Sequence, residues 1–451
     1  MTLSDTANVR FQNNKKYYIY KVGKSETLYG IAKKFNVNQQ DILELNPEVK
    51  NGLKADIDLL IPVAGMNHFT NTNGNELKFT PVNTKGDDHL QIAFITSLEL
   101  SKVYTGTADT SDTSAVFEPI AKQTVNNLQF VEGAIAAAEN FNVSNKNFKL
   151  STIIIDAEND TLQLAKIAWK FKSVDVWITN ETGPVLTYLN NLSIKNGVQI
   201  ISCGINTADI LKTNSNAVAL LPGSLLQCEL MAATIARKFP EATALFLKTS
   251  NSREIDRMKS FKRGWTAINE NPNRTIDLAK STVNAIVDSL HKSKKQIIFV
   301  PSSNEDLITN LLIALKAVKD DFDFILVGLP TWYNFETIDP MLLQQCNAWF
   351  FNSGAVPPLS NITLEFRQTF RNKYATEPLE SAYIGFDATN FLLNGRKQHG
   401  KDFLKIKSSN SYNGFFSDYH FESADEDGCL ENKHISVWNF QNIIPEKLKE
   451  N

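Results

Sequence analysis

The sequence predicts an α/β protein made of a small N-terminal module and a larger, two-lobed region of parallel sheets. Its 451 residues exceed what one hydrophobic core usually serves, so two or three domains are expected. From residue 90 onward, short apolar runs without polar alternation are each followed by a helical pattern. That pattern is typical of parallel strands covered by helices on both faces. Before residue 64 the texture differs, with two short helical patterns between two strands.

The composition is that of an ordinary globular protein, with 42% apolar residues, 21% charged residues and a formal net charge of −3. Basic and acidic residues are interspersed, so no nucleic-acid partner is expected. No apolar run approaches the roughly 18 residues that span a bilayer, so no transmembrane segment is expected. The first residues, MTLSDTANVRFQNNKKYY, lack the apolar core of a signal peptide. The protein is expected either to stay inside the cell or to begin, in this numbering, after a removed export signal.

The N-terminal module is expected at residues 17–63, after a flexible segment at 1–16. Residues 17–22 alternate and are rich in aromatic side chains, as strands are. Thr27 can cap one helix, and Asn38 a second, which ends before Pro47 because proline disfavours helix in the residue that precedes it. A strand at residues 57–63 completes a βααβ unit.

The module resembles the LysM family of carbohydrate-binding modules. The pieces that carry the resemblance stand in order: Y-x-V at 20–22, E-T-L-Y-G-I-A-K-K-F at 26–35, a modified L-x-x-L-N-P ending at Pro47, and L-x-I-P at 59–62. Two positions depart from the family. Ser25 and Glu26 stand where Gly-Asp is usual, and Asp56 stands where a glycine commonly precedes the last strand.

This resemblance implies a shallow groove for N-acetylglucosamine chains of peptidoglycan or chitin. One side would be formed by Ser25, Glu26, Thr27 and Leu28, and the other by Asn46, Pro47 and Leu53. Acetamido sugars need hydrogen-bonding groups and an apolar floor for the N-acetyl methyl group, and no charge is required. The alternative is that Leu28 and Leu53 are ordinary core residues and that the module is only a spacer.

A linker rich in Asn, Thr and Gly is expected at residues 64–89, before the two-lobed region. The expected strands are 90–95, 150–155, 174–178, 198–202, 243–248, 296–300, 322–327 and 348–352. The expected helices are 127–139, 162–171, 226–238, 254–268, 276–290 and 307–319. Residues 415–421 and 435–440 are predicted to form a final hairpin.

The two-lobed region resembles the type I periplasmic binding proteins, the superfamily of branched-chain amino acid receptors. The resemblance is carried by the order of diffuse pieces, at 91–95, 130–139, 178–183, 201–206, 383–388 and 413–415. In that family the chain crosses between the lobes three times. Lobe one is therefore expected at 90–217 with 354–412, and lobe two at 218–353 with 413–445.

Ligands of such folds bind between the lobes, at the carboxyl ends of strands and the N-termini of helices. The residues expected to line that cleft are Asn180, Glu181, Thr182, Gly204, Asn206, Ser302, Ser303, Thr331 and Trp332. The family's receptors for amino acids hold the ligand ammonium with a carboxylate from lobe two. The matching position, near Thr331, shows no acid, and Glu181 would repel a ligand carboxylate. We therefore expect the two-lobed fold of these receptors without the groups that bind an amino acid.

No catalytic constellation, metal site or cofactor is predicted. The six histidines have no metal-ligand spacing, and the four cysteines form no C-x-x-C pair. Cys346 could in principle be a hydrolase nucleophile, but its context indicates a buried junction between a helix and a strand. Asp156, Glu158 and Asp160 indicate a solvated loop or a helix cap rather than an acid/base pair.

The sequence therefore predicts a non-catalytic, peptidoglycan-binding protein of the periplasm or cell envelope. Its two-lobed domain would sense or bind either a small polar ligand or a partner protein. The alternative is a regulator that activates enzymes of cell-wall synthesis through protein–protein contacts, as a similar domain does in outer-membrane activators of penicillin-binding proteins. A LysM-anchored hydrolase is the third hypothesis.

Overall fold

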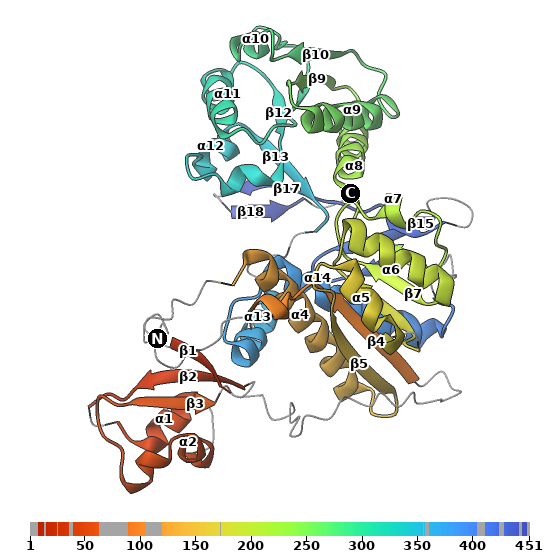
Figure 1. The fold of residues 1–451 in the computed structure, drawn as a ribbon. Helices are drawn as coiled ribbons and strands as arrows, with labels where there is room; N and C mark the ends of the chain where they lie inside the picture. Colours follow the sequence, from red (N-terminus) through yellow and green to blue (C-terminus); the bar gives the residue numbers. More distant parts are fainter. Residues whose placement is uncertain are drawn as a thin grey trace. The chain divides into compact units, whose positions relative to one another are not determined.

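The computed structural model describes residues 8–12, 15–24, 26–35, 39–62, 89–103, 120–171, 173–354, 356, 360–403, 411–423, 428–441 and 444–448 (Figure 1). The chain divides into two compact units: residues 1–81 with 358–378, and residues 82–357 with 379–451. The expected linker at 64–89 lies outside the described residues, except for His89. No helix in these ranges is both long enough and apolar enough to cross a membrane.

The N-terminal part of the first unit, up to residue 62, contains a three-stranded antiparallel sheet and two short α-helices. Its elements are β1 (Asn8–Gln12), β2 (Lys15–Lys21), α1 (Leu28–Phe35), α2 (Gln39–Leu45), the 3-10 helix η1 (Pro47–Asn51) and β3 (Asp58–Pro62). The sheet order is β1-β2-β3, so the predicted βααβ unit is present with an added strand. The prediction of a flexible segment at 1–16 is wrong for β1, because Asn8–Gln12 pairs with β2 along its whole length.

The same unit contains α13 (Asn361–Tyr374), which was expected in lobe one. Ser360 caps this helix by accepting a hydrogen bond from the backbone N–H of Thr363 at 3.2 Å. The helix ends at Ala375, whose φ of 56° is left-handed. In the sequence, this capped helix lies between residues 82–357 and 379–451, which form the second unit.

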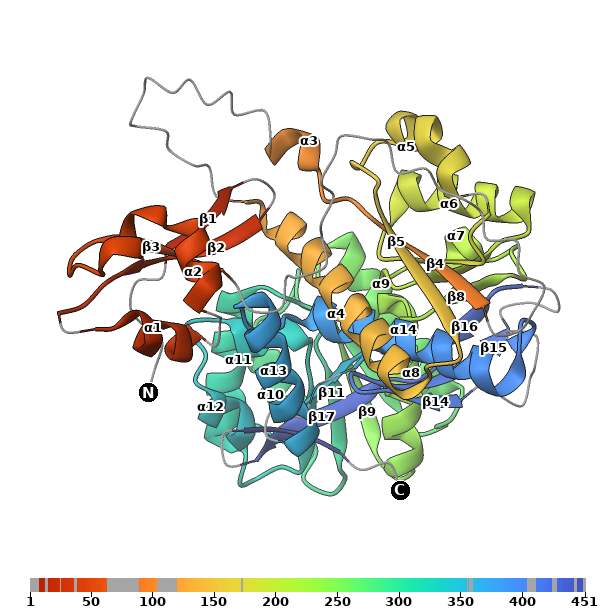
Figure 2. The ribbon, with the colours of Figure 1, turned by 90° about the horizontal axis from the view of Figure 1, so that it is seen from below.

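An eight-stranded sheet has the order β14-β15-β16-β8-β7-β6-β4-β5. Its strands are β4 (His89–Thr96), β5 (Lys149–Asp156), β6 (Val176–Thr179), β7 (Gln199–Ser202), β8 (Ala217–Ala219), β14 (Ser411–Asn413), β15 (Asp418–Ser423) and β16 (Leu430–Asn432). The strands from β16 to β5 pair in parallel. Helices cover both faces (Figures 1 and 2): α4 (Lys122–Ser144) and α14 (Glu380–His399) on one, and α5 (Thr161–Ile167), α6 (Gly183–Asn196) and α7 (Ala208–Leu211) on the other.

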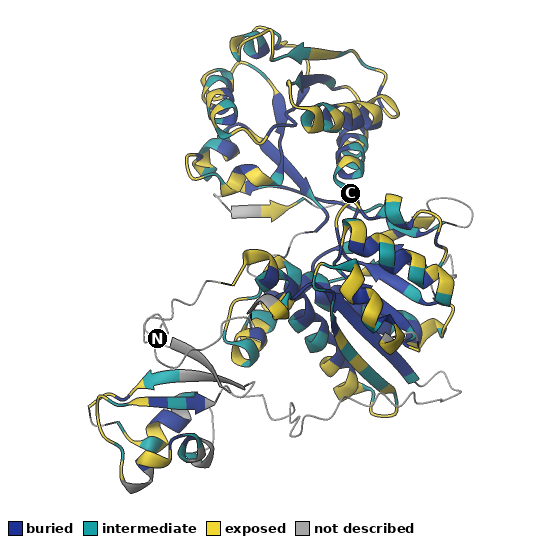
Figure 3. Ribbon diagram, viewed as in Figure 1, coloured by how far each residue is buried: buried dark blue, intermediate teal, exposed yellow. Residues whose placement is uncertain are grey.

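A seven-stranded sheet has the order β10-β9-β11-β12-β13-β17-β18. Its strands are β9 (Thr243–Lys248), β10 (Asn273–Asp277), β11 (Gln296–Phe299), β12 (Phe324–Val327), β13 (Ala348–Asn352), β17 (Ser436–Gln441) and β18 (Ile444–Lys447). Its helices are α8 (Ser224–Lys238), α9 (Ser252–Thr266), α10 (Asn284–Val287), α11 (Glu305–Val318) and α12 (Pro340–Gln345). The strands of both sheets are mostly buried, whereas the helices are buried on one side only (Figure 3). The predicted α/β class with parallel sheets is confirmed.

Two predictions for the second unit are wrong. The expected hairpin of 415–421 with 435–440 does not form, because β15 pairs with β16 in one sheet and β17 pairs with β13 in the other. Residues 413–445 therefore do not all belong to lobe two, since β15 and β16 lie in the sheet of lobe one. The expected helix at 276–290 is instead the end of β10, a turn and the short helix α10.

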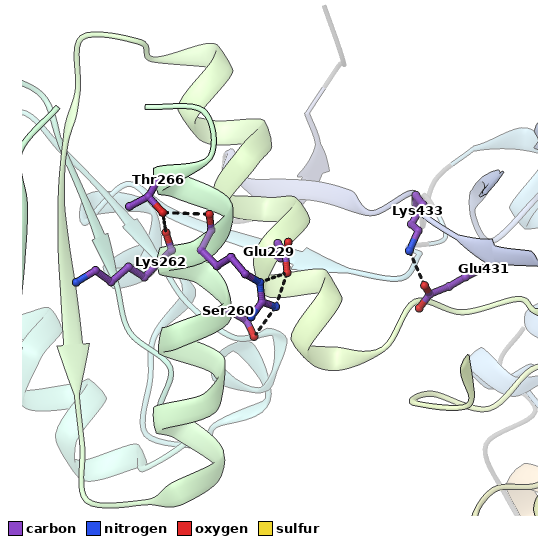
Figure 4. A network of polar contacts seen from close by, with 7 residues as sticks. Glu229, Ser260, Lys262, Thr266, Glu431 and Lys433 are labelled. Carbon is purple, nitrogen blue, oxygen red and sulfur yellow. Dashed lines mark hydrogen bonds and ion pairs between the residues drawn. The ribbon is translucent and has the colours of Figure 1, made fainter. Parts of the chain in front are cut away.

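Glycines allow helix backbones to touch in both lobes. A Cβ atom at Gly133 on α4 would lie 1.9 Å from the carbonyl oxygen of Ala382 on α14, and one at Gly385 would lie 2.0 Å from that of Phe130. In the other lobe, a Cβ at Gly264 on α9 would lie 2.1 Å from the carbonyl oxygen of Glu229 on α8. Beside this crossing, the Glu229 carboxylate accepts a hydrogen bond from Arg263 Nε at 2.8 Å (Figure 4).

Candidate functional site

The first side of the expected sugar groove is a loop that polar side chains hold in shape. The Glu26 carboxylate accepts hydrogen bonds from the Tyr20 hydroxyl at 2.7 Å and from the backbone N–H of Gly23 at 2.8 Å. The exposed Thr27 caps α1, because its hydroxyl accepts a hydrogen bond from the Gly30 N–H at 3.0 Å. Leu28 is half-buried against the module core. Ser25 lies outside the described residues.

The second side combines a buried amide with half-exposed apolar groups. Asn46 is 2% exposed, and its amide donates to the carbonyls of Ile42 and Leu60 while accepting from the Leu60 N–H. These bonds join the end of α2 to β3, so the side chain of Asn46 stabilises the fold of the module. Pro47 is exposed, and Leu53 is half-buried against the core.

Asp56 explains one departure from the family pattern. Its φ of 64° lies in the left-handed region, where glycine carries no steric penalty and aspartate is among the better tolerated side chains. The Asp56 N–H donates a hydrogen bond of 2.9 Å to the Val22 carbonyl, so the loop stays connected to the end of β2. The departure leaves the turn intact.

In the eight-stranded sheet, the carboxyl ends of β4 and β6 carry a closed network of polar side chains. The Thr96 hydroxyl donates to Asn180 Oδ1 at 2.6 Å, Asn180 Nδ2 donates to Asn127 Oδ1 at 2.9 Å, and Asn127 Nδ2 donates to the Ser97 carbonyl at 2.6 Å. Each of these side-chain amides therefore has a partner within the fold. The network leaves few hydrogen-bonding groups for a ligand carboxylate.

Glu181 follows this network and is 8% exposed. Burial raises the pKa of its carboxyl above the usual value, hydrogen bonds from Ser97 oppose that shift, and the nearby Asp156 and Glu99 reinforce it. Among the described residues, Oε1 of Glu181 has no hydrogen-bond partner. A buried carboxylate with an unused oxygen is costly unless it is protonated or meets a cation.

Gly204, Thr182 and Asn206 shape the neighbouring turns. A Cβ at Gly204 would lie 2.7 Å from the Thr182 methyl carbon, so the close approach of the two loops requires glycine. Thr182 is exposed. Asn206 has a left-handed φ of 62°, and its Oδ1 accepts a hydrogen bond from the Ser224 N–H at 2.7 Å, at the start of α8. Asn206 therefore holds the first crossing between the two sheets.

In the seven-stranded sheet, the ends of β11 and β12 bring the other four predicted residues together. The Ser303 and Thr331 hydroxyls lie 3.1 Å apart, and both residues are exposed. Ser302 is 1% exposed, and its hydroxyl donates to Glu254 Oε1 at 3.0 Å. Trp332 is fully buried, and its indole N–H donates to the Ser302 carbonyl at 2.8 Å. Of these four residues, Ser303 and Thr331 are the exposed pair.

The sequence reasoning missed Asn127, Glu254 and the role of Asp156. The Asp156 carboxylate accepts hydrogen bonds from the backbone N–H groups of Leu98, Glu99 and Leu100, so it anchors the loop after β4. The position of Asp156, directly after the predicted strand at 150–155, was the feature of the sequence that could have indicated this role. Asn127 and Glu254 lie on helices, where nothing in the local sequence indicates which strand end they approach.

The cysteines have the environment of buried core residues. Cys346 is fully buried, its thiol donates to the Leu312 carbonyl at 3.3 Å, and burial raises its pKa to about 11. A protonated, enclosed thiol is a poor nucleophile at neutral pH. Asp160 caps α5 by accepting hydrogen bonds from Leu162 and Gln163 N–H groups. No cluster of potential metal ligands occurs among the described residues.

Comparisons with known proteins find a family match in the N-terminal module and a likeness of fold over most of the chain. Residues 20–62 match the family model of the LysM domain. No curated protein matches the sequence. A solved structure described as a putative branched-chain amino acid ABC transporter from Rhodospirillum rubrum is similar, with a TM-score of 0.59, 13% identity and coverage of 80% of this chain and 100% of that one.

Two similar structures come from Haemophilus influenzae. One is the C-domain of LpoA, described as a regulator of PBP1A, with a TM-score of 0.51, 10% identity and coverage of 80% of this chain and 100% of that one. The other is full-length LpoA, with a TM-score of 0.53, 9% identity and coverage of 81% of this chain and 60% of that one. Identities this low show the fold alone. The chain carries a LysM domain followed by a domain with the fold of the type I periplasmic binding proteins.

Proposed function

We propose that this protein binds peptidoglycan in the periplasm or cell envelope and that its two-lobed domain binds a small polar ligand or a partner protein without catalysis. The LysM match at residues 20–62 carries the proposal. The apolar, half-buried Leu28 and Leu53 suit the N-acetyl groups of a glycan chain. The enclosed Cys346 supports a binding role over the LysM-anchored hydrolase.

The full chain is expected to sediment with purified peptidoglycan, and Leu53→Ala is expected to weaken this about tenfold, since apolar contact with the sugar is lost. Ile57→Ala is the matched control, because Ile57 is also half-buried against the same core. Each truncation is expected to lower the free energy of unfolding by about 1–2 kcal/mol. Asn46 is unsuitable as a probe, because its side chain joins α2 to β3.

Sedimentation should be measured against peptidoglycan concentration, with unfolding followed in parallel. No sedimentation of the wild type would refute sugar binding. Equal losses in Leu53→Ala and Ile57→Ala would show that the effect is one of stability and that Leu53 does not contact the glycan.

A second candidate function is the regulation of wall-synthesis enzymes through protein–protein contacts. The closed network at Thr96, Asn180 and Asn127 favours it, because these groups are satisfied without a ligand. The LpoA C-domain has the same fold and is described as a regulator of PBP1A.

Free leucine, isoleucine and valine are expected to leave the melting temperature unchanged, because Glu181 opposes a ligand carboxylate. A ligand at a hundredfold excess over its Kd would add about 2.7 kcal/mol of stability, which is a shift of a few degrees for a domain of this size. Differential scanning fluorimetry measures that shift. A rise in melting temperature with any of the three amino acids would contradict this prediction. It would indicate that the two-lobed domain binds branched-chain amino acids.

A further inference from the structure

One edge of the eight-stranded sheet is a long strand with an open side. β5 is last in the sheet order, and all 8 of its residues pair with β4, which lies beside it in Figure 2. The Ala157 N–H donates to the Thr96 carbonyl on β4, so the odd-numbered residues of β5 direct their backbone groups toward β4. The N–H and C=O groups of Leu150, Thr152 and Ile154 therefore point away from the sheet. Among the described residues, they have no hydrogen-bond partner.

The other edges of the two large sheets carry features that discourage pairing with a further strand. β18 contains Pro445 and ends in Glu446 and Lys447, and β14 has only 3 residues. β10 carries the charged residues Arg274 and Asp277. Between its first and last residues, β5 has no charge, proline or glycine, and its register with β4 is unbroken. Such an edge is a template for another strand.

The side chains along this edge suit a second copy of the same strand. Thr152 and Ile154 are exposed, and Leu150 is half-buried against the core of lobe one. All three lie on one face of the sheet, because side chains alternate along a strand. Antiparallel pairing of two copies, centred on Thr152, would place Thr152 opposite its own equivalent and Leu150 opposite the Ile154 of the second copy. Hydroxyl would then meet hydroxyl and apolar would meet apolar, which are favourable cross-strand pairs.

The charges at the two ends of β5 also favour a second copy. Lys146 and Lys149 are exposed at its start and form no ion pair among the described residues. Glu158 and Asp160 follow its end and are half-buried. Antiparallel pairing brings the start of one strand to the end of the other, so the lysines of each copy would approach the acids of the other copy. Parallel pairing would instead bring like charges together.

We propose that β5 is the contact surface of a twofold-symmetric dimer, in which two copies pair antiparallel about Thr152 and the two eight-stranded sheets become continuous. A second copy matches this edge in length, in its exposed side chains and in the charge at each end. The dimer carries two LysM domains, so it can bind a glycan chain at two points and hold it more tightly. That consequence rests on the proposed peptidoglycan binding, whereas the dimer itself is measured without peptidoglycan.

The test measures the mass of the full chain by sedimentation equilibrium over a range of protein concentrations. The wild type is expected to reach twice the mass of a single chain. Thr152→Lys is expected to weaken dimerisation at least about tenfold, because two like charges would lie directly opposite each other. Thr152→Glu is expected to do the same. An equimolar mixture of the two variants is expected to dimerise again, because the opposed charges then attract.

Thr275→Lys is the matched control, because Thr275 is an exposed threonine on β10, at an edge of the other sheet. It is expected to dimerise as the wild type does. A monomeric wild type, full dimerisation of Thr152→Lys, or equal losses in Thr152→Lys and Thr275→Lys would each overturn the proposal. A mixture of Thr152→Lys and Thr152→Glu that stays monomeric would overturn the pairing about Thr152.

A cysteine at the same position tests the register without using charge. Directly opposed, hydrogen-bonded residues of antiparallel strands have Cα atoms about 5.5 Å apart, which a disulfide can span. Oxidised Thr152→Cys is expected to run as a cross-linked dimer on a non-reducing denaturing gel, whereas Thr275→Cys and the wild type, whose own cysteines are buried, should run as single chains. No cross-link in Thr152→Cys, or equal cross-linking of both variants, would overturn the assignment.

Discussion

Replacing Gly385 with alanine is expected to lower the free energy of unfolding by about 3 kcal/mol or more. The added Cβ would lie 2.0 Å from the carbonyl oxygen of Phe130 and 3.0 Å from its carbonyl carbon. Both atoms are helix backbone, so no rotamer change can relieve the overlap. Alanine gains about 1 kcal/mol of helix propensity over glycine, which offsets only part of this cost.

The overlap must separate α4 from α14, and these two helices cover one face of the eight-stranded sheet (Figure 2). The measurement is the urea midpoint and slope of Gly385→Ala, with Lys397→Ala on the exposed face of the same helix as control. Lys397→Ala should stay within about 0.5 kcal/mol of the wild type. If Gly385→Ala behaves like Lys397→Ala, the two backbones are not in contact.

The sequence was sufficient to predict the parallel sheets because their central strands are continuous apolar runs. The strands at 90–95 and 348–352 appear as β4 and β13 with bounds that agree within a residue. The terminal region was not predictable in the same way. Phe421 and Trp438 stand in similar aromatic, alternating segments, and only tertiary packing places one in each hydrophobic core.

The candidate site was predictable in position but not in bonding. Asn180 and Glu181 follow a buried strand, so their place at the sheet edge follows from the sequence. The partner of Asn180 is Asn127, 53 residues earlier on α4, and its approach depends on the rotation of that helix against the sheet. For Asn46, the position in the motif predicted a place in the sugar groove. In the structure its side chain bonds instead to the backbone of β3.

Asp387→Asn is expected to cost about 2–3 kcal/mol, because the buried carboxylate of Asp387 is used on both oxygens. Oδ1 accepts from the Phe415 N–H at 2.7 Å. Oδ2 accepts from the N–H groups of Phe416 and Ser417 at 2.7 and 3.3 Å and from the Tyr419 hydroxyl at 3.0 Å. The amide of asparagine would turn its NH₂ group toward Phe415, where one N–H would lose its acceptor, rather than toward the other three donors.

The loss should reach beyond lobe one, because the loop that Asp387 holds also bonds to the end of β13. Ser417 Oγ donates to the Ser353 carbonyl at 2.6 Å, so a loosened loop weakens a connection between the two sheets. Asp175→Asn is the matched control, since one carboxylate oxygen of Asp175 accepts a single N–H bond, from Gln91 at 2.8 Å. Its expected cost is about 1 kcal/mol or less. Urea unfolding measures both variants.

The pH dependence shows whether burial or hydrogen bonding has the larger effect on the charge of Asp387. Burial raises the pKa of Asp387 to about 6, against the hydrogen bonds that favour its charged form. Its contribution to stability is therefore fully present below the unfolded-state value of about 4 and falls as pH rises through about 6. Asparagine cannot titrate, so the stability difference between the wild type and Asp387→Asn should be larger at pH 4 than at pH 7. A difference that grows with rising pH would mean that the hydrogen bonds outweigh burial and that the carboxylate is charged in the folded protein at every pH tested.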